Sequence, residues 1–387
     1  GGGAGGETLG SPRFGDDRVL VGGQFRPTRL VLDGSHLYWT TRGGTAGGGA
    51  AASGGAGGAG GAAGGGGAGA VGGGGSGGDG QIVILGAVVR VNKTGGTPTT
   101  VATAPEVTAL AVDDPHVYFA VLEDEVGSIQ VAPTEGGSPI TVLDGLGWPA
   151  DVAVDADSIY WSEVGTEGGL WFAPRPTVEF AAGGGGAGGG IVGAGGAGQG
   201  GGSAPEQIHT GSALLTFLRM DTDTLFFSDH GVVAHEGVIG AVDLQSKDTD
   251  LLVEGIDRPR YFAFDDRHLY VVTEGDGRVQ RVAKSGSGSP TVLAYEQDRP
   301  YGIAVDERAV YWTNSATTPP AGECEIANGS IMAMPIGGGD IVELASGQAC
   351  PLAIAVDDTG LYWVNMGRDN EPSSGAIMRM PKREPNY

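Results

Sequence analysis

Carboxylates recur at one position along this chain of 387 residues, and they are the first candidates for chemistry. Each follows a short apolar stretch and precedes a turn and an aromatic stretch, as in IAVDERAVYWTN from Ile303. The seven carboxylates are Asp33, Asp113, Asp155, Asp221, Asp265, Asp306 and Asp357. An aspartate can bind a metal, but it also accepts hydrogen bonds from backbone N–H groups just ahead of it and so fixes a turn. Because every unit has one, we predict that these residues shape the turns.

One segment gathers residue types that bind metals, namely Asp229, His230, His235 and Glu236. Histidines in loops are usually solvated, and outside the glycine-rich tracts no His-Glu-x-x-His, Gly-x-Ser-x-Gly or calcium-loop pattern occurs. We therefore predict no catalytic residue, no metal and no cofactor. An enzyme remains the least favoured hypothesis, and converging histidine and carboxylate side chains at the fold's axis would revive it.

The repeated unit predicts the fold. With the glycine-rich tracts removed, the units follow one another at about 41 to 51 residues, which is the period of a four-stranded propeller blade. The marker aromatic residues are Tyr38, Tyr118, Tyr160, Phe226, Tyr270, Tyr311 and Tyr362. Two further strands follow each aromatic stretch, and no segment has a helical apolar stripe with caps. The prediction is an all-β, seven-bladed propeller.

The two ends of the chain complete one unit between them. The last unit stops after its third strand, GAIMRMPKR, whereas RVLVGGQFRP from Arg18 is similar to IVELASGQACP from Ile341. We predict that the strand from Arg18 to Gln24 lies beside the strand from Ile377 to Met380. This pairing closes the ring and removes a sheet edge that would otherwise invite aggregation. The propeller would span residues 11–387, after a glycine-rich arm at residues 1–10.

One channel position breaks the repeat. The residue two before the aspartate is small in five units, at Ala111, Ala153, Ala263, Ala304 and Ala355. Arg219 occupies this position in the fourth unit. A buried charge without a partner is costly, and Asp151 is the nearest carboxylate by register. We predict an ion pair between Asp151 and Arg219 in the channel, with a ligand site as the alternative.

The chain has two cysteines, Cys324 and Cys350. In a propeller their two loops lie on the same face, so we predict a disulfide with Cα atoms within ~7 Å of each other. Two free thiols are the alternative. A disulfide implies an oxidising compartment, and hence a secreted or cell-surface protein.

The phrase GIAVDERAVYWTN, followed by GSIMAMPIGGG, resembles the YWTD repeats of lipoprotein-receptor propellers and the related NHL repeats. The resemblance covers nearly the whole chain outside its glycine tracts. It implies a binding or interaction role and no catalytic residue. Two departures are that those propellers usually have six blades and that YWTT, YWSE, YWTN and YWVN replace the tetrapeptide here.

Charge and glycine content limit the partners. The net charge of −24 disfavours nucleic acid and anionic membranes, and no segment approaches the roughly 20 apolar residues of a membrane span. The first residue is Gly rather than Met, so we expect a processed or trimmed form. Many of the 77 glycines fall in two insertions, at about 43–80 and 181–203.

Two functions follow from these features. One is an extracellular structural subunit that self-associates, as a homo-oligomer or filament, through polyglycine helices. The other is a monomeric secreted or surface propeller that binds a protein or glycan while the tracts are flexible loops. Self-association discriminates between them.

Overall fold

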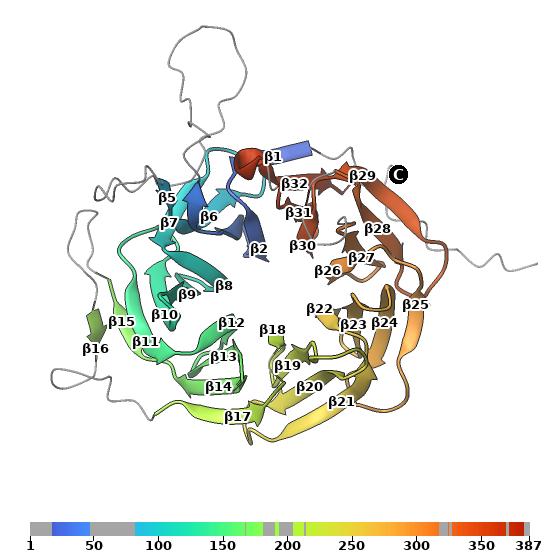
Figure 1. Cartoon of the computed structure of the whole chain (residues 1–387), viewed down its shortest axis with the longest axis horizontal. Coiled ribbons are helices and arrows are strands. Elements are labelled where there is room, and N and C mark those ends of the chain that lie inside the picture. Colours follow the sequence, from blue (N-terminus) through green and yellow to red (C-terminus); the bar gives the residue numbers. More distant parts are fainter. Residues whose placement is uncertain are drawn as a thin grey trace, which may run out of the picture.

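A computed structural model of the chain describes residues 18–46, 82–166, 168–180, 190–192, 204–212, 214–316, 324, 327–368 and 371–382. Its strands form seven four-stranded antiparallel sheets arranged as a ring, which confirms the seven-bladed propeller (Figure 1). We call the strands of each blade A to D from the axis outward. Within the described residues the one helical element is η1 (Pro372–Ser374).

Blades 1 to 4 follow the chain in order. Blade 1 has β2 (Pro27–Leu32), β3 (His36–Thr41), β6 (Gly86–Asn92) and β7 (Thr99–Ala104). Blade 2 has β8 (Glu106–Asp113), β9 (His116–Glu123), β10 (Val126–Pro133) and β11 (Ile140–Leu146). Blade 3 has β12 (Trp148–Val154), β13 (Ser158–Val164), β14 (Gly169–Pro174) and β17 (Glu206–Thr210). Blade 4 has β18 (Leu215–Met220), β19 (Thr224–Asp229), β20 (Gly237–Asp243) and β21 (Thr249–Ile256).

Blades 5 to 7 complete the ring. Blade 5 has β22 (Pro259–Phe264), β23 (His268–Thr273), β24 (Arg278–Ala283) and β25 (Thr291–Ala294). Blade 6 has β26 (Pro300–Val305), β27 (Ala309–Asn314), β28 (Gly329–Pro335) and β29 (Val342–Gln348). Blade 7 has β30 (Pro351–Val356), β31 (Gly360–Asn365), β32 (Gly375–Pro381) and β1 (Arg18–Gln24).

The N-terminal strand closes the ring, as the split unit predicted. β1 pairs antiparallel with β32, with Arg18 opposite Arg379 and Gln24 opposite Gly375. Blade 7 therefore contains both ends of the described chain. Its fourth strand covers an edge that would otherwise expose unpaired N–H and C=O groups.

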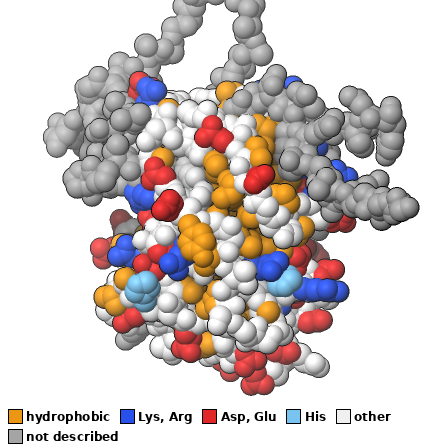
Figure 2. All heavy atoms as spheres, turned by 90° about the vertical axis from the view of Figure 1, so that its right-hand side faces the viewer, with side chains coloured by type: hydrophobic (Ala, Val, Ile, Leu, Met, Phe, Trp, Pro, Cys, Tyr) orange, Lys and Arg blue, Asp and Glu red, His pale blue; other side chains and the backbone are white. Residues whose placement is uncertain are grey.

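The strand B aromatics hold neighbouring blades together. Tyr311 of blade 6 is fully buried in one cluster with Leu361 and Trp363 of blade 7. An aromatic side chain of this kind buries ~150–250 Å², so these residues dominate the packing between blades. The rim is different. On the side that carries β25 and β29, hydrophobic side chains form a band beside charged ones (Figure 2). In or next to these two strands, Tyr295, Ile341 and Val342 are exposed.

The repeated aspartates cap the turns between strands A and B. In six blades one carboxylate oxygen accepts the backbone N–H groups two and three residues further on. In blade 6 these donors are Arg308 and Ala309, and the other oxygen of Asp306 accepts the Tyr311 hydroxyl at 3.1 Å. The structure thus gives six of the seven aspartates the turn-forming role expected of them, whereas Asp113 of blade 2 lies opposite His116 within the sheet.

The same aspartates also join adjacent blades. Lys382, directly after strand C of blade 7, lies 2.7 Å from the Asp306 carboxylate of blade 6. Three more junctions have an equivalent pair, formed by Lys93 with Asp357, Arg175 with Asp113, and Lys284 with Asp221. Burial raises the pKa of Asp306. The charge of Lys382 and the hydrogen bonds from backbone N–H groups lower this pKa by more, so it lies below its ordinary value overall.

Alternating strand directions define two faces. We call the face with the A–B turns the turn face, and the face where strand A begins the mouth face. The first glycine insertion follows strand B, on the mouth face, through the hairpin of β4 (Gly44–Ala46) and β5 (Ile82–Ile84). The second follows strand C, on the turn face, through β15 (Thr177–Glu179) and β16 (Gly190–Val192). The arm at 1–10 and the rest of both insertions lie outside the described residues.

Candidate binding site at the mouth of the channel

Arg29 spans the channel. It lies on strand A of blade 1, and its Nη1 donates to the hydroxyl of Tyr261, which is 232 residues away in blade 5. Its Nε and Nη2 donate to the carbonyl oxygens of Thr108 and Ala150 at 3.2 and 2.5 Å. Burial lowers the pKa of Arg29, but the charge of Asp151 and the Tyr261 hydroxyl raise it above its ordinary value overall. This guanidinium therefore links four blades and narrows the channel.

Asp151 and Arg219 both face the channel, but the ion pair is made by another residue. Asp151 is 4% exposed, and its Oδ2 lies 3.9 Å from Nη1 of Arg29. Its carboxylate also accepts the backbone N–H groups of Leu218 and Val152. Burial raises the pKa of Asp151, against the lowering effect of Arg29.

The side chain of Arg219 is exposed to the channel, and the walls of the channel surround it. Its guanidinium carbon lies 4.9 Å from the centre of the Phe217 ring. Burial lowers its pKa, and the charge of Asp151 acts in the opposite direction. Asp151 is therefore an electrostatic neighbour of Arg219 while Arg29 is the cation within ion-pair distance. A cavity of about 20 Å³ borders all three, which is room for about one water molecule.

A second cluster of charged residues lies on the mouth face, around Glu274. Glu274, which follows strand B of blade 5, is 12% exposed. Arg260 and Arg299 both lie 2.5 Å from its carboxylate, and Nε2 of His230 is 3.9 Å away. Burial raises the pKa of Glu274, but contacts with His230, Arg260 and Arg299 hold it well below its ordinary value overall. Two arginines share one carboxylate, so the cluster carries excess positive charge.

Arg260 and Arg299 border an open pocket of about 530 Å³ at the channel mouth. Its charged lining residues are Arg29, Arg42, Arg260, Arg299 and Glu106. Tyr261 and Tyr301 line it as well, with ring centres 5.1 Å apart, and the Arg260 guanidinium lies over Tyr301. The pocket is therefore locally positive in a chain whose net charge is −24.

The chemistry of this pocket favours binding over acid–base catalysis. Guanidinium groups stay protonated and cannot serve as a general base. The Glu274 carboxylate is already held by two cations. Several guanidinium groups directed at one space are suited to a carboxylate or phosphate, which they can bind through paired hydrogen bonds.

The candidate metal ligands at the end of β19 and in the loop after it do not converge on one point. The Asp229 carboxylate accepts the N–H and hydroxyl of Ser212 and the N–H of Gly231. His230 is directed toward Glu274 instead. Among the described residues, no group of three or more His, Cys, Asp or Glu side chains could hold a metal ion.

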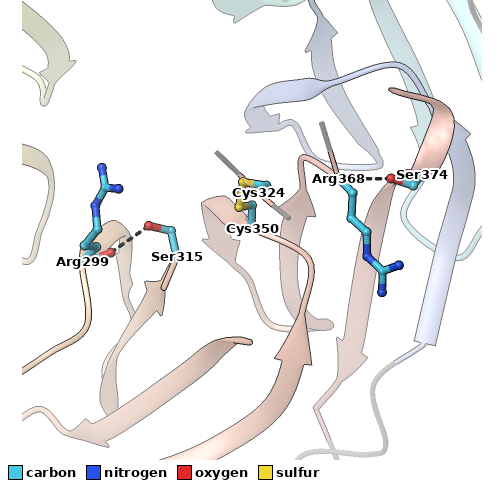
Figure 3. Close-up of a disulfide and its surroundings, with 6 residues drawn as sticks. All are labelled: Arg299, Ser315, Cys324, Cys350, Arg368 and Ser374. Atoms are coloured by element: carbon cyan, nitrogen blue, oxygen red, sulfur yellow. Dashed lines mark hydrogen bonds between the residues drawn. A yellow bond between two sulfur atoms is a disulfide. The ribbon is translucent and has the colours of Figure 1, made fainter. Parts of the chain in front are cut away.

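A disulfide braces the same face. Cys324 and Cys350 are bonded, with Cα atoms 5.9 Å apart and both side chains buried (Figure 3). Cys324 lies in the connection after strand B of blade 6 and lines the mouth pocket, while Cys350 directly precedes blade 7. The disulfide therefore ties two adjacent blades at the edge of the pocket.

Sequence reasoning missed most of the mouth residues. Arg29, Arg260, Glu274, Arg299 and Tyr301 received no prediction. A signal was present at the position four before each repeated aspartate, where the seven units differ strongly. It holds Arg29, Ala109, Asp151, Phe217, Tyr261, Gly302 and Ala353. A position that varies within an otherwise regular repeat marks side chains that the blade itself does not require.

Comparisons with known proteins agree with this fold. No protein-family model matches the chain. It is similar to the vitellogenin receptor Yl of Drosophila melanogaster, with 27% identity over 218 residues, which is 55% of this chain and 10% of the receptor. The chain thus corresponds to a small part of that relative.

Two solved structures share the architecture along nearly their whole length. A catalytically inactive virginiamycin B lyase from Staphylococcus aureus with quinupristin has a TM-score of 0.56 at 12% identity, over 95% of this chain and 98% of that one. The computationally designed Ika8 protein has a TM-score of 0.52 at 13% identity, over 93% and 98%. Identities this low show the fold alone. With its seven blades, its tyrosine–tryptophan repeats and its similarity to part of the vitellogenin receptor, the chain is a β-propeller with YWTD/NHL-like repeats.

Proposed function

We propose that this propeller is a non-enzymatic extracellular or cell-surface scaffold that binds a protein ligand by an acidic group at the channel mouth. The observation that carries the proposal is the excess of arginine there. Arg260 and Arg299 share the single carboxylate of Glu274, and Arg29 and Arg42 line the same pocket. In a chain of net charge −24, this pocket attracts anions while the surrounding surface repels them.

Two further observations support the setting. The relative in Drosophila is named as a vitellogenin receptor, which is a protein that binds another protein. The disulfide between Cys324 and Cys350 fits an oxidising compartment such as the cell exterior. No helix in the described part of the chain is long and apolar enough to cross a membrane. A glycan in place of a protein ligand is the alternative.

The test uses a pentaglutamate peptide as probe and a pentaglutamine peptide as its uncharged control. We expect the full chain to bind pentaglutamate at low salt, and the affinity to fall as salt is added. Arg260→Gln should weaken binding about tenfold or more, because a hydrogen bond to a charged group contributes ~1.5–3 kcal/mol. Arg299 still neutralises Glu274 in this variant, so the fold should persist. Calorimetric titration measures both affinities.

The matched control is Arg267→Gln, which removes the same charge from an A–B turn on the turn face. It should leave the affinity for pentaglutamate unchanged. Equal losses in both variants, or equal binding of pentaglutamine, would show that the mouth does not select an acidic group.

Self-association through the glycine tracts is the second candidate function. The observation that favours it is the placement of the two insertions on opposite faces, through the β4–β5 and β15–β16 hairpins. Sticky segments on both faces suit head-to-tail stacking into a filament. Deleting residues 43–80 should abolish assembly but keep blade 1, whose four strands lie outside that range. A monomeric full chain at high concentration in native mass spectrometry would exclude this function.

A further inference from the structure

Three blade junctions are closed by the same pair of side chains. A glutamine at the outer-strand end of one blade accepts the indole N–H of a strand B tryptophan in the next blade. The pairs are Gln24 with Trp39, Gln297 with Trp312, and Gln348 with Trp363, at 2.9 to 3.0 Å. In blades 6 and 7 an asparagine two residues after the tryptophan, Asn314 or Asn365, donates to the same glutamine. The glutamine side chain thus occupies the space beside the tryptophan at the junction between the two blades.

The junction between blades 2 and 3 departs from this pattern at both positions. Leu146 lies three residues before Pro149, where the glutamines lie three residues before Pro27, Pro300 and Pro351. Glu163 replaces the asparagine, and its Oε1 accepts the Trp161 indole N–H at 2.8 Å. Within the described structure, no hydrogen bond is made to Oε2 of Glu163.

An open cleft of about 490 Å³ lies at this junction. Its aromatic lining residues are Trp148, Trp161 and Trp171, and Trp148 is 49% exposed. Glu163 and Asp144 are its ionisable lining residues, and none of the described lining residues is Lys or Arg. A Cβ atom at Gly147 would lie 2.7 Å from Oε2 of Glu163, so a larger residue at this position would displace the carboxylate.

We propose that this cleft binds a cationic side chain, arginine or lysine, presented by a partner protein. An indole face attracts a guanidinium or ammonium group within about 6 Å of its centre, and tryptophan is the strongest aromatic partner for such cations. The second oxygen of Glu163 is available to accept a hydrogen bond from the same cation. Trp148 also lines the channel mouth, so one partner can reach both sites. The cation site does not depend on the anion site.

The first experiment titrates N-acetylarginine amide into the full chain and follows the six tryptophan indole N–H signals by NMR. N-acetylcitrulline amide is the control, because it has nearly the same shape without the charge. We expect the signals of Trp148 and Trp161 to shift with the arginine probe alone, and salt to weaken the effect. Equal shifts with citrulline, no shift with arginine, or a larger shift with methyl glucoside would overturn the proposal.

The second experiment changes the cleft. Trp148→Ala and Glu163→Gln should each weaken arginine binding on the order of threefold to tenfold, from the strength of cation–π and exposed charge contacts. Leu146→Gln combined with Glu163→Asn recreates the pair found at two other junctions, so this variant should fold and lose binding. Undiminished binding by that folded variant would contradict the proposal. Arg260→Gln should leave arginine binding unchanged, which separates this site from the mouth.

Discussion

The two faces of this propeller use charged residues in opposite ways. On the turn face, equivalent aspartates make equivalent bonds in blade after blade, and four of them pair with a cation of the next blade. On the mouth face, equivalent positions hold different side chains, so Arg29, Asp151 and Tyr261 occupy one slot of the repeat. The comparison teaches that repeated charges maintain the ring, whereas charges that break the repeat are available for recognition.

The junction between blades 2 and 3 extends the same lesson. Leu146 and Glu163 replace a glutamine and an asparagine that close other junctions, and a cleft lined by tryptophan results. Blade packing tolerates the loss because Trp161 finds another acceptor within its own strand. A departure from the repeat can therefore create a cleft that binds a partner without disrupting the packing between blades.

The strongest test of the comparison removes one turn-face carboxylate. Asp306→Ala loses two backbone caps, the Tyr311 hydroxyl bond and the ion pair with Lys382. We expect the free energy of unfolding to fall by about 3 kcal/mol, because the variant loses several hydrogen bonds to a charged group at once. Urea unfolding measures the loss. Binding of pentaglutamate and of the arginine probe should not change, and a change would break the division between the faces.

An intermediate effect is expected at Glu274 on the mouth face. The pKa of this group is lower in the folded state than its ordinary value of about 4.3, so its contribution is complete above about pH 5 and is lost as pH falls. Glu274→Gln should cost about 1–2 kcal/mol at pH 7. Urea unfolding should show this difference shrinking as the pH falls from 5 toward 3, because Glu274 takes up a proton in the unfolded chain while the folded carboxylate stays ionised. A difference that grows as pH falls would contradict the assigned charge state.

The same variant sharpens the comparison through binding. Glu274→Gln releases Arg260 and Arg299 from their shared carboxylate, so the affinity for pentaglutamate at pH 7 should rise severalfold even though the protein is less stable. A carboxylate on the turn face has no such effect, because its cation is not directed at the mouth.

The smallest effect is expected from adding a missing inter-blade pair. Ile336 follows strand C of blade 6, at the position that Lys382 and Lys284 occupy in other blades. By equivalence of the blades, the turn aspartate across this junction is Asp265. Ile336→Lys should raise the free energy of unfolding by up to about 0.5–1 kcal/mol at low salt, as partly exposed ion pairs do. The gain should vanish at 1 M salt. A loss of stability at low salt would show that the apolar contacts of Ile336 outweigh the pair.

Much of the fold could be predicted because its signals are local and recur. An aspartate before a turn, an aromatic strand and a period near 45 residues describe one blade, and the split unit places β1 beside β32. The inter-blade pair of Lys382 with Asp306 was missed, because its partners are 76 residues apart and neither is unusual alone. The candidate site was missed for the same reason, since Arg29 meets Tyr261 across the ring.

The sequence by itself determined the number of blades, the closure of the ring and which loops the two cysteines join, because each depends on repeated spacing or on loop class. Only the tertiary structure decided which charges meet. Arg29 rather than Arg219 forms the ion pair with Asp151, and Arg260 and Arg299 converge on Glu274. The physical reason is that closing the ring brings strands of distant blades to one axis, where side-chain length and direction, not sequence separation, select the partners.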